Sequence, residues 1–174
     1  LDFGSKIDIE INSKVNLLTN FILNNPEIIK NYYITNIIPS YNKIIINFDS
    51  LKIKKNKIFN LLNSIKISKN LNESHKKIIE IPICYDPPYS LDFLNIMEIT
   101  NLKKNELINS HLKTLFHVYM IGFLPGLPFM GHNKDISILP RKITPRINIP
   151  KGSVGLVDNL CVIYPQNSPG GWNI

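Results

Sequence analysis

Apolar residues recur at the spacing of an amphipathic helix in two segments of the first half of the chain, residues 13–23 and residues 57–66. In the second segment they fall at i, i+3, i+4 and i+7: Ile58, Leu61, Leu62 and Ile65. Runs rich in β-branched and aromatic residues predict strands over 3–9, 32–38, 43–48 and 78–83. The order β-α-β-β-α-β is the split βαβ, or ferredoxin-like, pattern. We expect this part to be a packing scaffold, because it contains no cluster of acid, base and nucleophile.

The second half of the chain has a different texture. Short helices are predicted from Ser90 to about Ile99 and over 102–112, and strands over 116–121, 153–157 and 160–164, the last two joined by a turn at Asp158-Asn159. Seven of the eight glycines and seven of the twelve prolines lie at or after Gly122, which indicates many specified turns. Short strands joined by such loops predict a small β-barrel or sandwich that the chain leaves unclosed. We therefore expect an α+β protein with an N-terminal α/β domain over 1–84, a helical connector over 85–114 and a partial β-domain over 115–174.

Charge and composition narrow the possible partners. The net charge of +7 comes from lysines spread along the whole chain, and aromatic residues are not interleaved with them, so nucleic acid is only a minor alternative. No apolar run approaches the ~20 residues of a membrane-spanning helix and no signal peptide is visible, which predicts a cytoplasmic protein without a membrane partner. Cys84 and Cys161 are expected to be reduced and buried, and the four histidines lack the spacing of a metal site. The missing initiator Met suggests a fragment of a longer protein.

Two arginines are the first candidates for chemistry. All eighteen other strong cations are lysine, a bias expected of AT-rich codons, whereas Arg141 and Arg146 lie five residues apart in Pro140-Arg-Lys-Ile-Thr-Pro-Arg146. Arginine resists replacement by lysine where its planar fork must grip a carboxylate or phosphate with two bonds. The alternative is a pair of surface ion pairs, or a contact that fixes the turn.

Four strings now occur in a fixed order: Gly122-Phe-Leu-Pro-Gly-Leu-Pro-Phe-Met-Gly131, the arginine segment, Pro150-Lys-Gly-Ser-Val-Gly155, and Tyr164-Pro-x-x-Ser-Pro-Gly-Gly-Trp172. In this order and spacing the chain resembles the KipI / allophanate hydrolase subunit 1 family, described as the PxpB-like subunit of the bacterial ATP-dependent 5-oxoprolinase. The resemblance is dense over 119–172 and thin before Ile78. Leu127, Phe129 and His132 depart from the usual loop, and His117 stands where many relatives carry arginine.

The resemblance implies a small α/β domain followed by a cyclophilin-like β-barrel. It implies a partner of the KipA / allophanate hydrolase subunit 2 type and a third subunit of the LamB/YcsF type, which together convert 5-oxoproline to glutamate with ATP and Mg²⁺. Three alternatives stay open: a regulatory module that inhibits a sensor histidine kinase, a carboxyltransferase component of a urea carboxylase, and a prolyl isomerase, the weakest of the three because fold does not fix function.

The candidate site residues follow from the motifs. Arg141 and Arg146 suit a carboxylate or phosphate, and a histidine, His111 or His132, could move a proton. The remaining candidates for substrate or anion binding lie in the loops: Gly122, Phe123, Pro125, Gly126, Thr144, Ser168, Pro169, Gly170, Gly171 and Trp172. Each has a structural alternative: His111 as a core residue, the glycines as turns and Trp172 as a plug of the barrel. Because no phosphate-binding loop is present, we expect ATP to be bound by or shared with a partner subunit, and the chain alone to be inactive.

Overall fold

The first helix begins where Asp8 accepts hydrogen bonds from the backbone N–H groups of Glu10 and Ile11, which caps the N-terminus of α1 (Ile9–Leu23). The structure, a computed structural model, describes residues 1–65, 77–131, 136 and 138–174. The chain divides into two units, residues 1–79 and residues 80–174. Within the described residues no helix is both long and apolar enough to cross a membrane.

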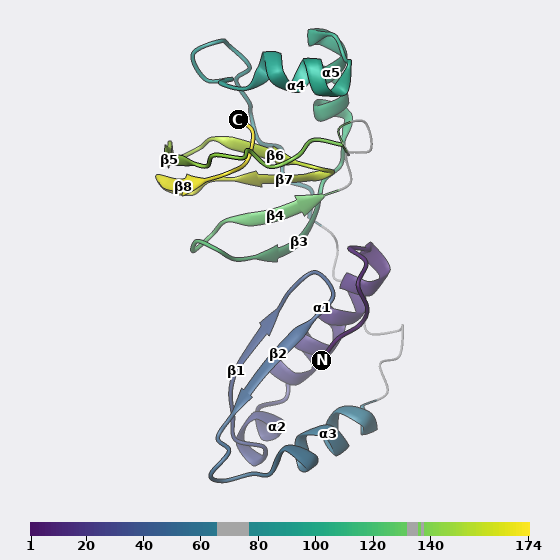
Figure 1. Cartoon of the computed structure of the whole chain (residues 1–174). Helices are drawn as coiled ribbons and strands as arrows, with labels where there is room; N and C mark the ends of the chain where they lie inside the picture. The colour runs from purple at the N-terminus through teal and green to yellow at the C-terminus, as the bar shows by residue number, and fades with distance from the viewer. Residues whose placement is uncertain (66–76, 132–135, 137) are drawn as a thin grey trace. The chain divides into compact units, whose positions relative to one another are not determined.

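The first unit contains α1, α2 (Pro26–Asn31), an antiparallel hairpin of β1 (Ile34–Pro39) and β2 (Ile44–Phe48), and α3 (Lys55–Ser64). Figure 1 shows α1 along one face of the β1–β2 ribbon. Its core is aliphatic and joins both helices' inner faces to the ribbon: Val15, Leu18, Ile22, Ile34 and Ile44, with Leu62 and Ile65 packed against them. The helices and the hairpin predicted from the hydrophobic pattern are confirmed, and α2 was missed.

Two strands predicted for this part are wrong. Residues 3–8 form no strand, because the cap at Asp8 turns the chain into α1 and only Asp2 bridges to Lys43. Residues 78–83 also form no strand, and Ile78 and Ile79 are each 68% exposed, so this apolar run has no buried face. The ferredoxin-like assignment stays a prediction, since the described residues of this unit form a two-stranded sheet.

The second unit begins with two helices, α4 (Phe93–Thr100) and α5 (Lys104–Lys113). A four-stranded antiparallel sheet follows in the order β3 (His117–Ile121), β4 (Pro128–Gly131), β7 (Leu160–Ile163), β6 (Val154–Val157). A separate ribbon pairs β5 (Arg146–Ile149) with β8 (Ser168–Gly170). The described part of the chain thus forms small antiparallel sheets and no closed barrel, and the cyclophilin-like assignment stays a prediction.

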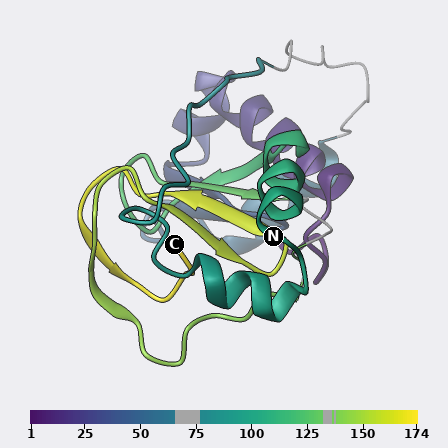
Figure 2. The same ribbon diagram turned by 90° about the horizontal axis from the view of Figure 1, so that it is seen from above.

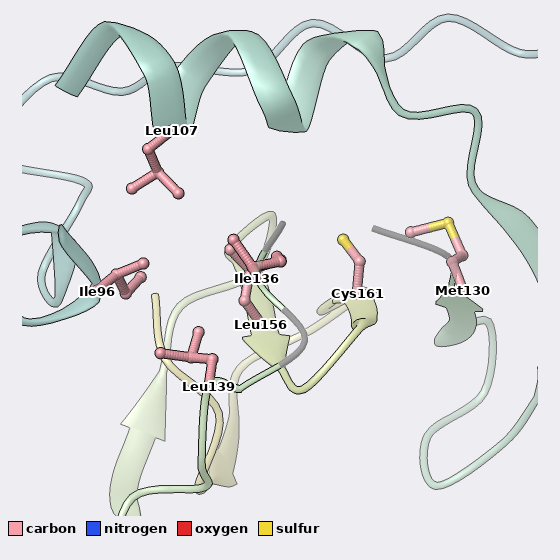
Figure 3. Packing of buried hydrophobic residues seen from close by; sticks show 7 residues of the cluster. All are labelled: Ile96, Leu107, Met130, Ile136, Leu139, Leu156 and Cys161. Carbon is pink, nitrogen blue, oxygen red and sulfur yellow. The ribbon is translucent and has the colours of Figure 1, made fainter. Parts of the chain in front are cut away.

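Side chains alternate between the two faces of this sheet and build two cores. On one face the helices, which Figures 1 and 2 show over the sheet, bring Ile96 and Leu107 to a cluster drawn in Figure 3: Ile96, Leu107, Met130, Ile136, Leu139, Leu156 and Cys161. Segment 85–114, predicted as a connector, therefore shares a core with the strands. The other face packs against β5 and the C-terminal segment through Leu127, Ile149, Val157, Val162, Tyr164 and Trp172.

Candidate functional site

A buried carboxylate, Asp92, binds one of the two arginines. Arg146 donates from Nη1 and Nη2 to the two Asp92 oxygens at 2.8 and 2.7 Å, and Lys142 Nζ donates to Oδ1 at 2.7 Å. The backbone N–H of Ile174 donates to Oδ2 at 2.8 Å, while the Asp92 N–H donates to the Ile174 carbonyl at 2.7 Å. The Asp92 side chain is 5% exposed. Its two oxygens accept four hydrogen bonds, which is about the full capacity of a carboxylate.

These contacts decide the charge of Asp92. Burial by itself raises the pKa, but the hydrogen bonds from Arg146, Lys142 and the Ile174 N–H, with the charge of Arg146, outweigh burial and lower the pKa of Asp92 from 3.8 to about 2. The pKa of Arg146 is raised by the same hydrogen bonds. Asp92 is therefore ionised at neutral pH and holds Arg146 and Lys142 against the protein.

The second arginine has a different partner. The guanidinium carbon of Arg141 lies 5.6 Å from the centroid of the Trp172 ring, in a cation–π contact. Arg141 is exposed, and among the described residues no carboxylate pairs with it. The structure thus separates the two arginines, which the sequence suggested as a pair facing one anion: Arg146 serves an internal carboxylate, and Arg141 presents its donors to solvent.

The backbone around Arg141 is fixed on both sides. The carbonyl of Pro140 accepts from Asn173 Nδ2 at 2.9 Å, and the N–H of Lys142 donates to the Gly171 carbonyl at 2.9 Å. Thr144, a further candidate in the same segment, is exposed. Arg141 therefore projects from a segment that the C-terminal residues hold in place.

Trp172 is held from below. It is 6% exposed and meets Phe129 edge-on, with ring centroids 5.9 Å apart. A Cβ at Gly155 would lie 2.9 Å from the Trp172 Cβ, so only glycine lets the tryptophan approach β6. Burial raises the pKa of the neighbouring Tyr164, and the charge of Arg141 partly offsets this, which places Arg141 close to the tyrosine. The ring under Arg141 is therefore a rigid platform.

The loop between β3 and β4 carries Gly122, Phe123, Pro125 and Gly126. It closes on itself, because the Gly122 N–H donates to the Leu127 carbonyl at 3.1 Å and the Leu124 N–H to the Gly122 carbonyl at 2.8 Å. Phe123 sits at the centre of this γ-turn with a φ of +64° and is 67% exposed, a strained position for an aromatic residue. The Gly122 N–H is thus occupied within the loop, and the exposed feature of the loop is the Phe123 ring.

The segment after β7 places the remaining motif residues beside Trp172. Gly170 pairs with Arg146 across the β5–β8 ribbon, and a Cβ there would collide with the Tyr164 hydroxyl. Ser168 is buried and donates to the Pro169 carbonyl at 2.9 Å, while Pro169 is exposed. Gly171 lies against Lys142 and Pro145 with room to spare, since a Cβ would come no closer than 3.7 Å. Arg141, Gly170, Gly171 and Trp172 therefore lie together.

His111 lies elsewhere, in the core beneath α5. It is 6% exposed, its Nδ1 is 2.7 Å from the Tyr85 hydroxyl and its Nε2 is 3.8 Å from the Cys161 sulfur. Burial lowers the pKa of His111 and raises the pKa values of Tyr85 and Cys161 to about 12, so all three are neutral at pH 7. These contacts match the structural alternative of a satisfied core histidine. His132, the other histidine considered, lies outside the described residues.

Sequence reasoning missed Asp92, Lys142 and Gly155. The signal for Asp92 was its position before a helix, which is typical of an N-cap, although here its side chain makes no cap hydrogen bond. Within the described residues no three His, Cys, Asp or Glu side chains come together as a metal site would require. Of the cysteines, Cys161 is buried as predicted, whereas the prediction that Cys84 is buried is wrong, since Cys84 is exposed.

Known proteins resemble the chain both in sequence and in fold. Over 102 residues, 59% of this chain and 42% of the relative, the chain is 39% identical to the B-type subunit of 5-oxoprolinase from Bacillus subtilis. It matches a crystal structure of TTHA0988 with a TM-score of 0.83 and 28% identity, covering 99% of this chain and 33% of that one. The Kluyveromyces lactis urea carboxylase, at 18% identity, a TM-score of 0.72, and 99% of this chain against 17% of that one, shares the fold. The alignments span less than half the length of the curated relatives.

The family match agrees with the four motifs and with the resemblance that they carry. The model of the family described as carboxyltransferase domain, subdomain C and D, matches residues 1–174, the whole of the chain. The chain therefore belongs to the carboxyltransferase domain family, subdomains C and D.

Proposed function

We propose that this chain is a component of an ATP-dependent 5-oxoprolinase complex and that Arg141 binds the carboxylate of 5-oxo-L-proline. The observation that carries the proposal is the position of Arg141. It is stacked on a buried tryptophan, and within the described residues it has no carboxylate partner, while both neighbouring cations are held by Asp92. A rigid guanidinium with free donors is suited to a bidentate carboxylate.

The names of the relatives support this assignment. Three proteins from Bacillus subtilis, Haemophilus influenzae and Escherichia coli, at 30–39% identity, each carry the name of the B-type subunit of 5-oxoprolinase. A subunit name implies other subunits, and we propose that these are of the KipA type and the LamB/YcsF type. The exposed Phe123, together with Ile143 and Ile147, which are 102% and 92% exposed, offers apolar contacts for such a partner.

ATP fits this chain poorly. The turn Lys151-Gly152-Ser153 is the segment most like the end of a phosphate loop, but its N–H groups are occupied: Lys151 donates to Asn167 Oδ1, Gly152 to the Tyr164 carbonyl and Ser153 to the Pro150 carbonyl. They leave no donors to cradle a phosphate. We propose that ATP and Mg²⁺ are held by a partner subunit and that this chain supplies the grip on the substrate.

The test uses the assembled complex and the chain alone. The chain is co-expressed with its partner subunits, and glutamate release from 5-oxoproline is measured with Mg-ATP. Arg141→Lys keeps the charge but loses the fork, and we expect a loss of at least about tenfold in kcat/KM, the size of one charge-assisted hydrogen bond. For the chain alone, 5-oxoproline is expected to change the fluorescence of Trp172, the only tryptophan. Full activity of Arg141→Lys, or steady hydrolysis by the isolated chain, contradicts the proposal.

A further inference from the structure

The segment Pro140–Arg146 holds three cations, and the structure binds two of them internally. Lys142 and Arg146 both end on Asp92, at 2.7 Å from Oδ1, whereas Arg141 lies on Trp172. The Lys142 and Arg146 side chains keep 27% and 23% of their exposure. Both are thus at the edge of the surface, and one buried carboxylate keeps them from reaching a ligand beside Arg141.

We propose that Asp92 is a specificity-determining residue that restricts the anion site at Arg141 to monocarboxylates. This inference rests on the proposed function. With Asp92 ionised, one guanidinium faces the ligand, which matches one carboxylate. Without the Asp92 charge, the side chains of Arg146 and Lys142 become available, and the site offers the three positive charges that a phosphate or pyrophosphate prefers.

The geometry supports an effect on the ligand as well as on the fold. Arg146 pairs with Gly170 and Lys142 donates to the Gly171 carbonyl, so both cations are attached to the two residues that precede Trp172. The stem of Lys142 is also adjacent in sequence to Arg141. A guanidinium or ammonium group released from Asp92 therefore lies next to the platform on which the ligand is proposed to bind.

The experiment compares two probes on the 174-residue chain, 5-oxoproline and inorganic pyrophosphate, by calorimetry and by Trp172 fluorescence. The quantity measured is the ratio of the two dissociation constants. In Asp92→Asn we expect the preference for pyrophosphate over 5-oxoproline to rise by about tenfold or more, as one additional charge-assisted hydrogen bond would give. Asp92→Glu, which keeps the charge, and Asp158→Asn, which removes an exposed carboxylate, are expected to keep the wild-type ratio.

A second variant covers the case in which Asp92→Asn does not fold. Asp92→Asn with Arg146→Gln leaves one released cation instead of two, and its ratio is expected between those of the wild type and the single variant. A wild-type ratio in every folded variant that lacks the Asp92 charge overturns this inference and leaves the proposed function intact. A wild-type chain that binds neither probe overturns both.

Discussion

The stability that Asp92 contributes can be worked out from its contacts. Its pKa is lowered from 3.8 to about 2, and at about 1.4 kcal/mol per pH unit this difference is worth about 2 kcal/mol at neutral pH. Because the folded-state pKa is the lower one, the unfolded chain takes up the proton first. The stabilisation is therefore complete above a pH of about 4 and is lost as the pH falls from about 4 to about 2.

Replacing Asp92 by Asn has a larger effect, since it also leaves Arg146 and Lys142 without their carboxylate. Breaking a buried ion pair from one side costs about 3–5 kcal/mol. The two cations are 23% and 27% exposed, so water screens them in part, and we expect a loss near the lower limit, about 3 kcal/mol.

Urea unfolding followed by Trp172 fluorescence is the appropriate assay, because this single tryptophan lies in the second unit and reports on its unfolding. Asp158→Asn is the matched control: the same substitution at an exposed carboxylate, expected within about 0.5 kcal/mol of the wild type. The reasoning is refuted if Asp92→Asn unfolds at the same urea concentration as Asp158→Asn. It is also refuted if the wild type and Asp92→Asn lose stability equally between pH 4 and pH 2.

Three further outcomes are expected. Burial lowers the pKa of His111 below 6.5, so the wild type loses stability as the pH falls below 6.5, and His111→Gln, measured by urea midpoints from pH 7 to pH 5, shows a smaller slope. Phe123→Gly relieves the positive φ and raises the unfolding free energy by about 1 kcal/mol in thermal melts, while it lowers the activity of the assembled complex; a destabilised variant contradicts the assignment of strain. Gly170→Ala is expected to displace Tyr164 and cost about 1–3 kcal/mol, whereas Gly171→Ala, with its nearest atom 3.7 Å away, serves as the control and stays within about 0.5 kcal/mol of the wild type.

The helices were predictable because their apolar periodicity is local and the structure buries the same positions. Ile58 of α3 and Leu107 of α5 are buried as the pattern requires. The strands were predicted less well, since pairing is decided by distant segments. Pro128, Pro169 and Gly170 count against a strand in isolation, yet β4 and β8 form because Met130 pairs with Cys161 and Gly170 with Arg146.

The candidate site shows the same division. The motifs identified the loops that hold Arg141, Gly170, Gly171 and Trp172, because their glycines and prolines are written in the sequence. The role of Asp92 was not predictable, as its partners Lys142, Arg146 and Ile174 lie 50, 54 and 82 residues away. Nor could the sequence show that His111 faces Tyr85 and Cys161, which bind it in the core.

Both arginines are retained in a chain otherwise rich in lysine, and the structure shows why their retention cannot separate their roles. Arg146 makes the two parallel bonds for which lysine is unsuited, and Arg141 makes the planar contact with Trp172 for which lysine is also a poor substitute. Retention of arginine therefore marks a need for the guanidinium shape, whether the anion is internal or external. The position of a carboxylate decides between the two: Asp92 reaches Arg146, and no described carboxylate reaches Arg141. The donors of Arg141 are therefore where the negative charge of a bound ligand is expected to lie.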